Sequence, residues 1–344
     1  MSWYHIPGNQ QDLAICTCIR LSRNLAGYPF PARMEAGSAK EIVRQIGGVL
    51  EKNGFLPTDP AEITAATARS LVEKRFMSPH FLRMSLPRAL FVNEPCNLAV
   101  MVNETDHAVI QSIQAGASLR DTLEGALKVE ALLDQHFELA FDGRLGYLTA
   151  SPALLGTAIT ASVTLSLPLL AEKGRTAAIG QVLERQGMEF KALTLDEQAD
   201  TLTQRDTVGL FVLSNRTSLG VTEEETVELL ERGVQTLAKE ERDQRSALSG
   251  EEFERIADRI CRAEGILRHA RMLGWGEAVK HLSLLRLGAA MGITPAVRAE
   301  TMTALLVEAM PATLVLGVDV APKNREEMNR LRAQVVRESL FGGS

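Results

Sequence analysis

The polar cluster at residues 103–107 is the stretch whose residue types and spacing could do chemistry. It reads Asn-Glu-Thr-Asp-His and follows a short apolar run that reads Val-Met-Val. Carboxylates and a histidine held side by side can orient a cationic group and move a proton. The alternative is structural, with Asp106 and His107 hydrogen-bonded to each other at the end of a strand. The sequence therefore predicts a working site here, or the frame of one.

Strand-like and helix-like runs alternate over the first two-thirds of the chain and would position this cluster. Ser38 is a candidate N-cap for a helix expected at residues 38–54, and a second helix is expected at residues 118–141. The uncharged run at residues 153–171 contains Pro168 and several Thr and Ser residues. We interpret it as a buried strand and helix rather than a membrane span. Strands are predicted at residues 12–21, 88–95, 97–104 and 207–215.

From Thr222 onward the pattern is helical. Thr222 and Glu225 have the spacing of a capping box at the start of a long helix, and Ser249 opens the next one. The rest of the chain contains no strand-like run. We therefore predict a domain boundary inside or just after the long helix, which gives one domain at residues 1–245 and a helical domain at residues 246–344.

Composition and charge exclude several classes of protein. The chain has 344 residues, of which 45% are hydrophobic and 23% charged, with a net charge of −6. This balance lacks the basic field expected of a nucleic-acid or membrane-surface binder. The amino terminus lacks the pattern of a signal peptide, and four scattered cysteines favour a reducing, cytoplasmic setting. We interpret Cys16 and Cys18 as buried thiols and predict no metal site, because no further ligand has a matching spacing.

Segments spread over nearly the whole chain resemble guanidino kinases, most closely the bacterial protein-arginine kinases. The resemblance implies an α+β fold, in which a central antiparallel sheet flanked by helices is followed by an all-helical domain used for dimerisation. It also implies transfer of the γ-phosphoryl group of ATP to the guanidinium of a protein arginine. The segments read "IRLSRNLAGYPFPARM", "LVEKRFMSP", "MVNETDHAVIQ", "AFDGRLGYLTASP", "LGTAITASV", "SNRTSLG", "GILRHARML" and "LSLLRLGAAMGI".

Three positions that the resemblance assigns to phosphate-binding arginines hold other residues. Phosphoryl transfer needs fixed cations, and arginine suits the task because its planar group grips phosphate oxygens with two bonds. Here those positions are Cys18, Val109 and Thr160, none of which can carry a positive charge. A hydrogen bond to a charged group is worth about 1.5–3 kcal/mol, so their loss would remove roughly 4–9 kcal/mol of phosphate binding. Normal use of ATP is therefore not expected.

Three cations remain as candidates for binding a nucleotide. Arg20 is the surviving arginine of the first segment, and Arg75 replaces a histidine that touches nucleotide in the family. Lys191 aligns with the arginine of a loop whose two glycines are absent here. The alternative is that Arg20 and Arg23 are surface or structural charges, and that Lys191 is an ordinary solvated lysine.

The carboxylates that would orient the acceptor guanidinium are also degenerate. The resemblance implies a glutamate at Thr105 and a reactive cysteine at Ser151, and the nearest counterpart of the second acid is Asp196. Glu104 survives, but alternation along a strand would point it to the opposite face from Thr105. The catalytic positions Thr105, Ser151 and Asp196 are therefore only remnants.

A phosphoarginine-reading surface that the resemblance implies in the helical domain departs from its motif as well. The motif Arg-Asp-x-x-Arg-Ala corresponds to residues 328–333, where Arg332 and Ala333 remain. Met328 and Asn329 replace its arginine and aspartate. A simpler interpretation of this segment is an amphipathic terminal helix.

The residues that the resemblance assigns to the fold are present, whereas several charged residues that it assigns to phosphate binding are replaced. This combination predicts a pseudokinase, that is, a non-catalytic interaction protein. Its expected partners are a second copy, an active homologue, the kinase activator or the Clp protease machinery. Neither nucleic acid nor a membrane is expected as a partner. A different hypothesis is a ligand-binding module whose pocket is lined by Thr105, Thr160 and Ser151.

The main alternative is an active but divergent ATP:guanidino phosphotransferase. It would bind Mg-ATP, the one cofactor considered, through Arg20, Arg75 and Lys191. Its acids would be Asp196 and Glu197 in a rearranged loop. This hypothesis requires the three cations to converge on one cleft.

Overall fold

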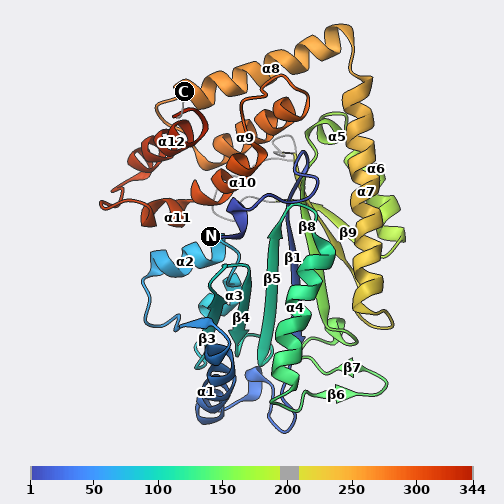
Figure 1. Cartoon of the computed structure of the whole chain (residues 1–344), viewed down its shortest axis with the longest axis vertical. Helices are drawn as coiled ribbons and strands as arrows, with labels where there is room; N and C mark the ends of the chain where they lie inside the picture. The colour runs from blue at the N-terminus through green and yellow to red at the C-terminus, as the bar shows by residue number, and fades with distance from the viewer. Residues whose placement is uncertain (1, 194–208, 343–344) are drawn as a thin grey trace.

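The computed structural model describes residues 2–193 and 209–342. Within these residues, eight strands form one antiparallel sheet in the order β2-β3-β4-β5-β1-β8-β10-β9. The long strand β1 lies inside the sheet between β5 and β8, and a separate hairpin pairs β6 with β7 (Figure 1). The strands are β1 (Ala14–Arg23), β2 (Phe55–Thr58), β3 (Ala89–Asn93), β4 (Leu98–Val102), β5 (Ala108–Ala115), β6 (Phe141–Asp142), β7 (Gly146–Tyr147), β8 (Ile159–Ser166), β9 (Met188–Ala192) and β10 (Leu210–Asn215).

One face of the sheet is covered by three helices, α1 (Ala36–Lys52), α4 (Leu119–Asp134) and α7 (Glu223–Ala247). Their buried apolar residues form one cluster with Ile19 and Leu21 of β1. Residues 19 and 21 are two apart on a strand and therefore point to the same side of the sheet. The residues of β1 between and beside them point to the opposite side.

The helices after α7 lie together at one end of the sheet, at the top of Figure 1. Leu282, Leu305 and Val336 from three of these helices belong to the same apolar cluster as Met101 and Val109 of the sheet. The helices of this region are α8 (Gly250–His269), α9 (Trp275–Ala290), α10 (Ala299–Glu308), α11 (Pro311–Leu316) and α12 (Arg325–Phe341). Shorter elements are α2 (Ala65–Glu73), α3 (Pro79–Arg83), α5 (Pro168–Glu172), α6 (Thr176–Arg185) and the 3-10 turns Trp3–His5, Pro31–Arg33 and Pro152–Leu154.

The expected fold class is confirmed, and so are most of the predicted elements. Each predicted strand overlaps β1, β3, β4 or β10, and the uncharged run at residues 153–171 forms β8 and α5. The capping box of α7 is present: the Thr222 hydroxyl accepts the Glu225 N–H at 3.1 Å, and the Glu225 carboxylate accepts the Thr222 N–H at 2.8 Å. After α7 the described residues form helices and connections but no strand.

Two predicted helix ends are wrong. Ser38 does not cap α1, because the helix has already begun: the Ala39 N–H donates to the carbonyl of Glu35 at 3.0 Å. The helix expected to reach residue 141 ends at Asp134, since the chain then turns into the β6–β7 hairpin.

The predicted domain boundary near residue 245 falls inside α7 and stays a prediction. The apolar cluster that joins the sheet to the last helices crosses it. Among the helices of the described residues, none has the length and apolar character needed to span a bilayer.

Candidate functional site

Four positions that the sequence singled out lie beside one another on one face of the sheet. Cys18 and Arg20 share that face of β1 because they are two residues apart. Arg20 lies opposite Thr160 of β8 and Gln111 of β5. Val109 is two residues from Gln111 and therefore faces the same way. The structure thus brings the surviving arginine and the three substituted positions into one group, which we call the Arg20 patch (Cys18, Arg20, Val109 and Thr160).

Arg20 is half-buried and held by an uncharged partner. Its Nε donates to Oε1 of Gln111 at 2.6 Å. Gln111 is fully buried, and its Nε2 has no hydrogen-bond partner among the described residues. No ion pair to Arg20 is present in the described part of the chain. Its positive charge is therefore not neutralised there.

The three substituted positions of the patch are uncharged. Burial raises the pKa of the Cys18 thiol, although the nearby charges of Arg20 and Arg75 act in the opposite direction. Val109 is only 5% exposed and packs in the apolar cluster below the last helices. Thr160 is exposed. The patch therefore contains one cation where the family's motifs would place four.

Arg75 is the second cation near the patch. It follows Lys74, the C-cap of α2, and has a φ of 62° that costs energy for a residue with a side chain. The residue is half-buried, and its charge acts on the Cys18 thiol, as that of Arg20 does. The charges of two of the three candidate cations, Arg20 and Arg75, therefore both act on the pKa of Cys18.

Lys191 lies apart from the other candidates. It is on the edge strand β9, three strands from β1, where its Nζ contacts the Glu189 carboxylate at 2.7 Å. Its side chain is 68% exposed. Asp196 and Glu197, the acids considered for a rearranged loop, lie outside the described residues.

The cluster at residues 103–107 is a turn between β4 and β5, not the end of a strand. The expected strand alternation of Glu104 and Thr105 therefore does not apply. The buried Glu104 carboxylate instead accepts hydrogen bonds from the Ser78 hydroxyl at 2.7 Å and from the Thr105 N–H. Burial alone would raise the pKa of Glu104, but these bonds outweigh it and lower that pKa. Because Ser78 also caps α3 through the Phe81 N–H, Glu104 has a structural role.

The structural alternative expected a hydrogen bond between Asp106 and His107. Instead, each of them bonds to other residues. Asp106 Oδ1 accepts a hydrogen bond from Asn24 Nδ2 at 2.6 Å. His107 Nδ1 accepts the Leu25 N–H at 3.0 Å, and its Nε2 donates to the Pro29 carbonyl at 2.9 Å. Burial lowers the pKa of His107, so its imidazole is neutral at pH 7. Both residues tie the loop after β1 to the turn before β5.

Ser151, the position of the family's reactive cysteine, precedes the turn Pro152–Leu154. Its carbonyl accepts a hydrogen bond from the Thr149 hydroxyl at 2.9 Å. Ser151, Thr105 and Thr160 do not line the groove between α4 and α7. The ligand-binding hypothesis for these three positions stays a prediction.

Arg332 and Ala333, the remnants of the phosphoarginine motif, are buried in α12. Arg332 donates to the carbonyls of Ala309 and Leu273 and to Oδ1 of Asn329, each at 2.8 Å. Burial lowers the pKa of Arg332 to about 10. Two of these bonds join α12 to the segments just before α9 and just after α10, and the donors do not face solvent.

Arg23 is a charge whose role the sequence left open. It is fully buried, with its Nε 2.6 Å from Glu130 and its Nη2 3.8 Å from Glu223. Its guanidinium lies 3.6 Å from the centre of the Tyr147 ring. The one sequence feature that could have indicated a different role for Arg23 is its three-residue spacing from Arg20, which puts the two arginines on opposite faces of β1. Arg23 is therefore a structural charge.

Comparison with protein families accounts for almost the whole chain. The model described as "ATP:guanido phosphotransferase, C-terminal catalytic domain" matches residues 40–244. The chain belongs to this family. The model described as "Protein-arginine kinase McsB C-terminal domain" matches residues 253–342. The resemblance noted in the sequence is therefore confirmed.

Full-length relatives in the family are protein-arginine kinases. The one from Symbiobacterium thermophilum is 34% identical over 347 residues, which cover 98% of this chain and 96% of the relative. The one from Brevibacillus brevis is 32% identical, covering 98% and 95%. This chain is thus a homologue of the protein-arginine kinases along its length.

Solved structures of other guanidino kinases share the fold. The substrate-free duplicated taurocyamine kinase from Schistosoma mansoni matches with a TM-score of 0.60 and 23% identity, covering 76% of this chain. This chain spans 40% of that duplicated protein. A lombricine kinase matches with a TM-score of 0.59 and 21% identity, covering 70% of this chain and 69% of its own. At these identities the likeness shows the fold alone.

Proposed function

We propose that this chain is a non-catalytic homologue of the protein-arginine kinases that acts through contacts with other proteins. The observation that supports this is the Arg20 patch. Three positions that correspond to family arginines surround Arg20 on one face of the sheet and carry no charge. Three lost charge-assisted bonds would weaken phosphate binding by roughly 10³- to 10⁶-fold.

Mg-ATP, the ligand that the family implies, does not fit this patch. Several negative charges would meet Arg20 and Arg75, while Lys191 lies three strands away and is paired with an acid. Thr105 stands where the acceptor guanidinium needs a carboxylate, and Glu104 already accepts bonds from its own neighbours. We therefore assign no phosphoryl-transfer step to these residues.

The partners that we propose are those the family suggests: a second copy, an active homologue, the kinase activator or the Clp protease machinery. The proposed compartment is the cytoplasm. All four cysteines are free thiols in the structure, which supports a reducing setting.

Titration of Mg-ATP by calorimetry, with thermal unfolding alongside, tests the proposal. A ligand present at 100 times its dissociation constant stabilises a fold by about 2.7 kcal/mol, so real binding registers in both measurements. We expect neither heat nor a thermal shift at millimolar Mg-ATP, while the Brevibacillus brevis relative serves as the control preparation. Micromolar binding by this chain would overturn the proposal.

A divergent phosphotransferase is the second candidate, because Arg20 and Arg75 both act on Cys18. It predicts phosphoarginine on a protein substrate incubated with Mg-ATP and this chain alone. The product is sought by mass spectrometry, with Arg75→Gln as the matched inactive variant. Phosphoarginine formed by the wild type and lost in Arg75→Gln would establish the second candidate. Its absence in both agrees with the non-catalytic proposal.

A further inference from the structure

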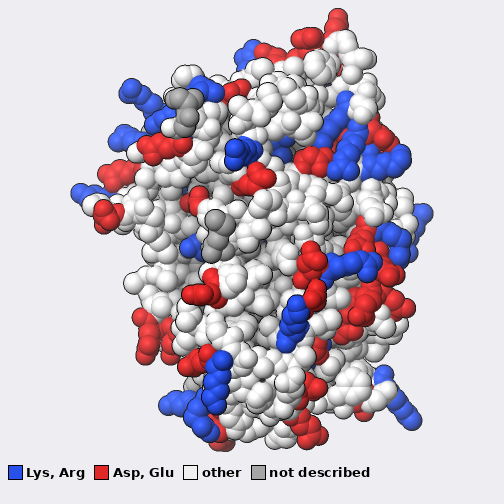
Figure 2. All heavy atoms as spheres, viewed as in Figure 1, with Lys and Arg blue, Asp and Glu red and all other residues white. Residues whose placement is uncertain are grey.

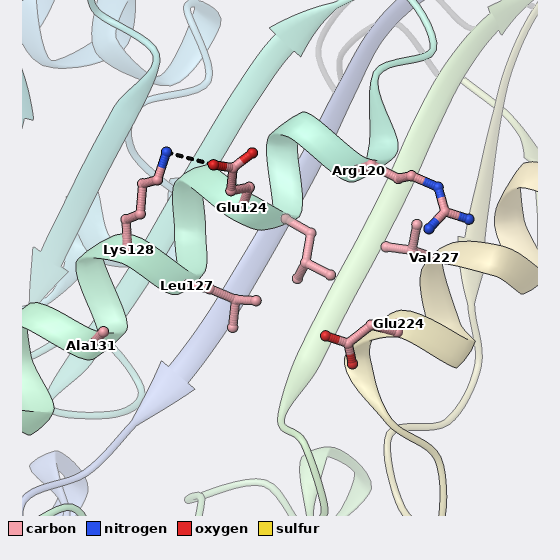
Figure 3. A pocket seen from close by; sticks show the side chains of 8 residues that line it. Arg120, Glu124, Leu127, Lys128, Ala131, Glu224 and Val227 are labelled. Carbon is pink, nitrogen blue, oxygen red and sulfur yellow. Dashed lines mark ion pairs between the residues drawn. The ribbon is translucent and has the colours of Figure 1, made fainter.

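A groove of about 440 Å³ runs between α4 and α7, on the side of the sheet opposite to Arg20. Its floor is apolar and consists of Leu123, Leu127, Ala131 and Val227. Leu123 and Val227 are buried core residues, Leu127 is half-buried and Ala131 is exposed. Figure 3 shows Leu127 and Glu224 pointing into the space between the two helices. An apolar side chain placed there would bury further apolar surface.

Ion pairs already neutralise most charges around this groove. Arg120 of α4 contacts Glu231 of α7 at 2.8 Å and so bridges the two helices at one end. Lys128 and Glu124 pair with each other along α4 at 2.6 Å (Figure 3). Glu224 has no ion-pair partner among the residues that the structure describes. The groove therefore combines an apolar floor with one unpaired carboxylate.

The start of α7 is acidic beyond this one residue. Residues 223–231 read Glu-Glu-Glu-Thr-Val-Glu-Leu-Leu-Glu and contain no Lys or Arg. Glu223 faces Arg23, Glu225 belongs to the capping box, and Glu228 and Glu231 face Arg120. Figure 2 shows acidic side chains gathered along this side of the molecule. A cationic partner would meet complementary charge here, whereas an acidic one would be repelled.

We propose that the α4–α7 groove is a docking surface for a basic, apolar segment of a partner protein. An arginine or lysine of that segment would lay its aliphatic stem on Leu127 and Ala131 and bring its charge to Glu224. Leu123 and Val227 are already buried and close the bottom of the groove, so an apolar neighbour one helical turn away would add to the cover of the half-buried Leu127. The surface uses none of the residues of the Arg20 patch. Its test can therefore fail or succeed independently of the Mg-ATP test above.

Fluorescence anisotropy with a defined probe tests the docking surface. The probe is a fluorescein-labelled peptide, Ala-Leu-Arg-Ala-Ala-Leu-Arg-Ala-Leu, and its counterpart has glutamate in place of each arginine. We expect the basic probe to bind the full chain at low salt and the acidic one not to bind. Ala131→Lys, which blocks the groove with an added cation, should weaken binding by at least about ten-fold.

Two substitutions that each remove one carboxylate charge, one inside the groove and one outside it, give a matched comparison of probe binding. Glu224→Gln should weaken binding by about two- to five-fold, as expected for an exposed ion pair. Glu251→Gln removes an equivalent exposed charge from the first turn of α8, away from the groove, and should leave binding unchanged. Equal effects of these two substitutions, or full binding by Ala131→Lys, would overturn the proposal. So would a change in self-association of Ala131→Lys in sedimentation, because a second copy would then be the occupant.

Discussion

Arg20 and Arg23 stand three residues apart on one strand, yet their surroundings differ in kind. Arg20 is half-buried on one face of the sheet, where an uncharged amide holds it. Arg23 is fully buried on the other face, between two glutamates and over the ring of Tyr147. The first belongs to a group whose other members are uncharged, and the second to a network of buried ion pairs.

This difference separates what the fold needs from what phosphate binding needs. A buried charge without its counter-charge is costly, so Arg23, Glu130 and Glu223 stabilise one another only as a set. A cation that binds phosphate needs no internal acid, and its loss costs the folded state little. Substitution at Cys18, Val109 and Thr160 is therefore compatible with an intact fold.

The largest effect is expected from removing the charge of Arg23. Arg23→Met leaves the buried Glu130 and the half-buried Glu223 carboxylates beside an apolar side chain, and should lower the free energy of unfolding by about 3–5 kcal/mol. Urea unfolding followed by circular dichroism measures it. Arg20→Gln is the matched control, for which we expect a change within about 1 kcal/mol. Similar losses for the two variants would remove the distinction between the two faces.

A smaller effect is expected from restoring one lost cation. Thr160 is exposed and lies opposite Arg20, so Thr160→Arg would place two guanidinium groups side by side. One added charge-assisted bond is worth about 1.5–3 kcal/mol, or roughly 10- to 100-fold in phosphate affinity. Calorimetric titration of inorganic phosphate compares this variant with Thr217→Arg, an exposed substitution outside the patch. An equal gain in both would show that the patch has no special geometry for phosphate.

The features that the sequence predicted correctly depend on residues that are close together in the chain, and those it missed depend on residues far apart in the chain. The strands and the capping box at Thr222 are local patterns, and their prediction is confirmed. The partners of Arg23 were not, because Glu130 lies 107 residues away and joins Arg23 only through tertiary packing. The face on which Glu104 lies was predicted wrongly, since the strand ends at Val102 and a turn replaces the expected alternation.

Titration of Tyr147, whose ring lies against Arg23, measures how strongly burial affects ionisable groups on that face of the sheet. Burial, together with a hydrogen bond to Glu130, raises the pKa of Tyr147 to about 12. A raised pKa in the folded state means that this contribution to stability is complete below about pH 10, the ordinary value, and is lost as the pH rises through about 12. Burial also raises the pKa of Tyr4, so the titration is made in a Tyr4→Phe background. There, phenolate absorbance should show a late step that Tyr147→Phe removes and Tyr28→Phe retains. A late step that survives Tyr147→Phe in this background would contradict the assignment.

The smallest effect concerns Ala158, which lies in the loop that joins the two regions. The neighbouring Thr157 carbonyl accepts a hydrogen bond from Arg23 at 3.1 Å, and Thr160 of the Arg20 patch follows two residues later. Ala158 has a φ of 51°, a left-handed conformation that costs about 1–2 kcal/mol for a residue with a Cβ atom. Glycine removes that cost but loses about 0.5–1 kcal/mol through the greater freedom of the unfolded chain. Ala158→Gly should therefore raise the free energy of unfolding by up to about 1.5 kcal/mol, whereas Ala153→Gly, at an exposed position without positive φ, should lower it. Destabilisation by Ala158→Gly would mean that the alanine methyl group contributes packing between the two regions that outweighs the strain.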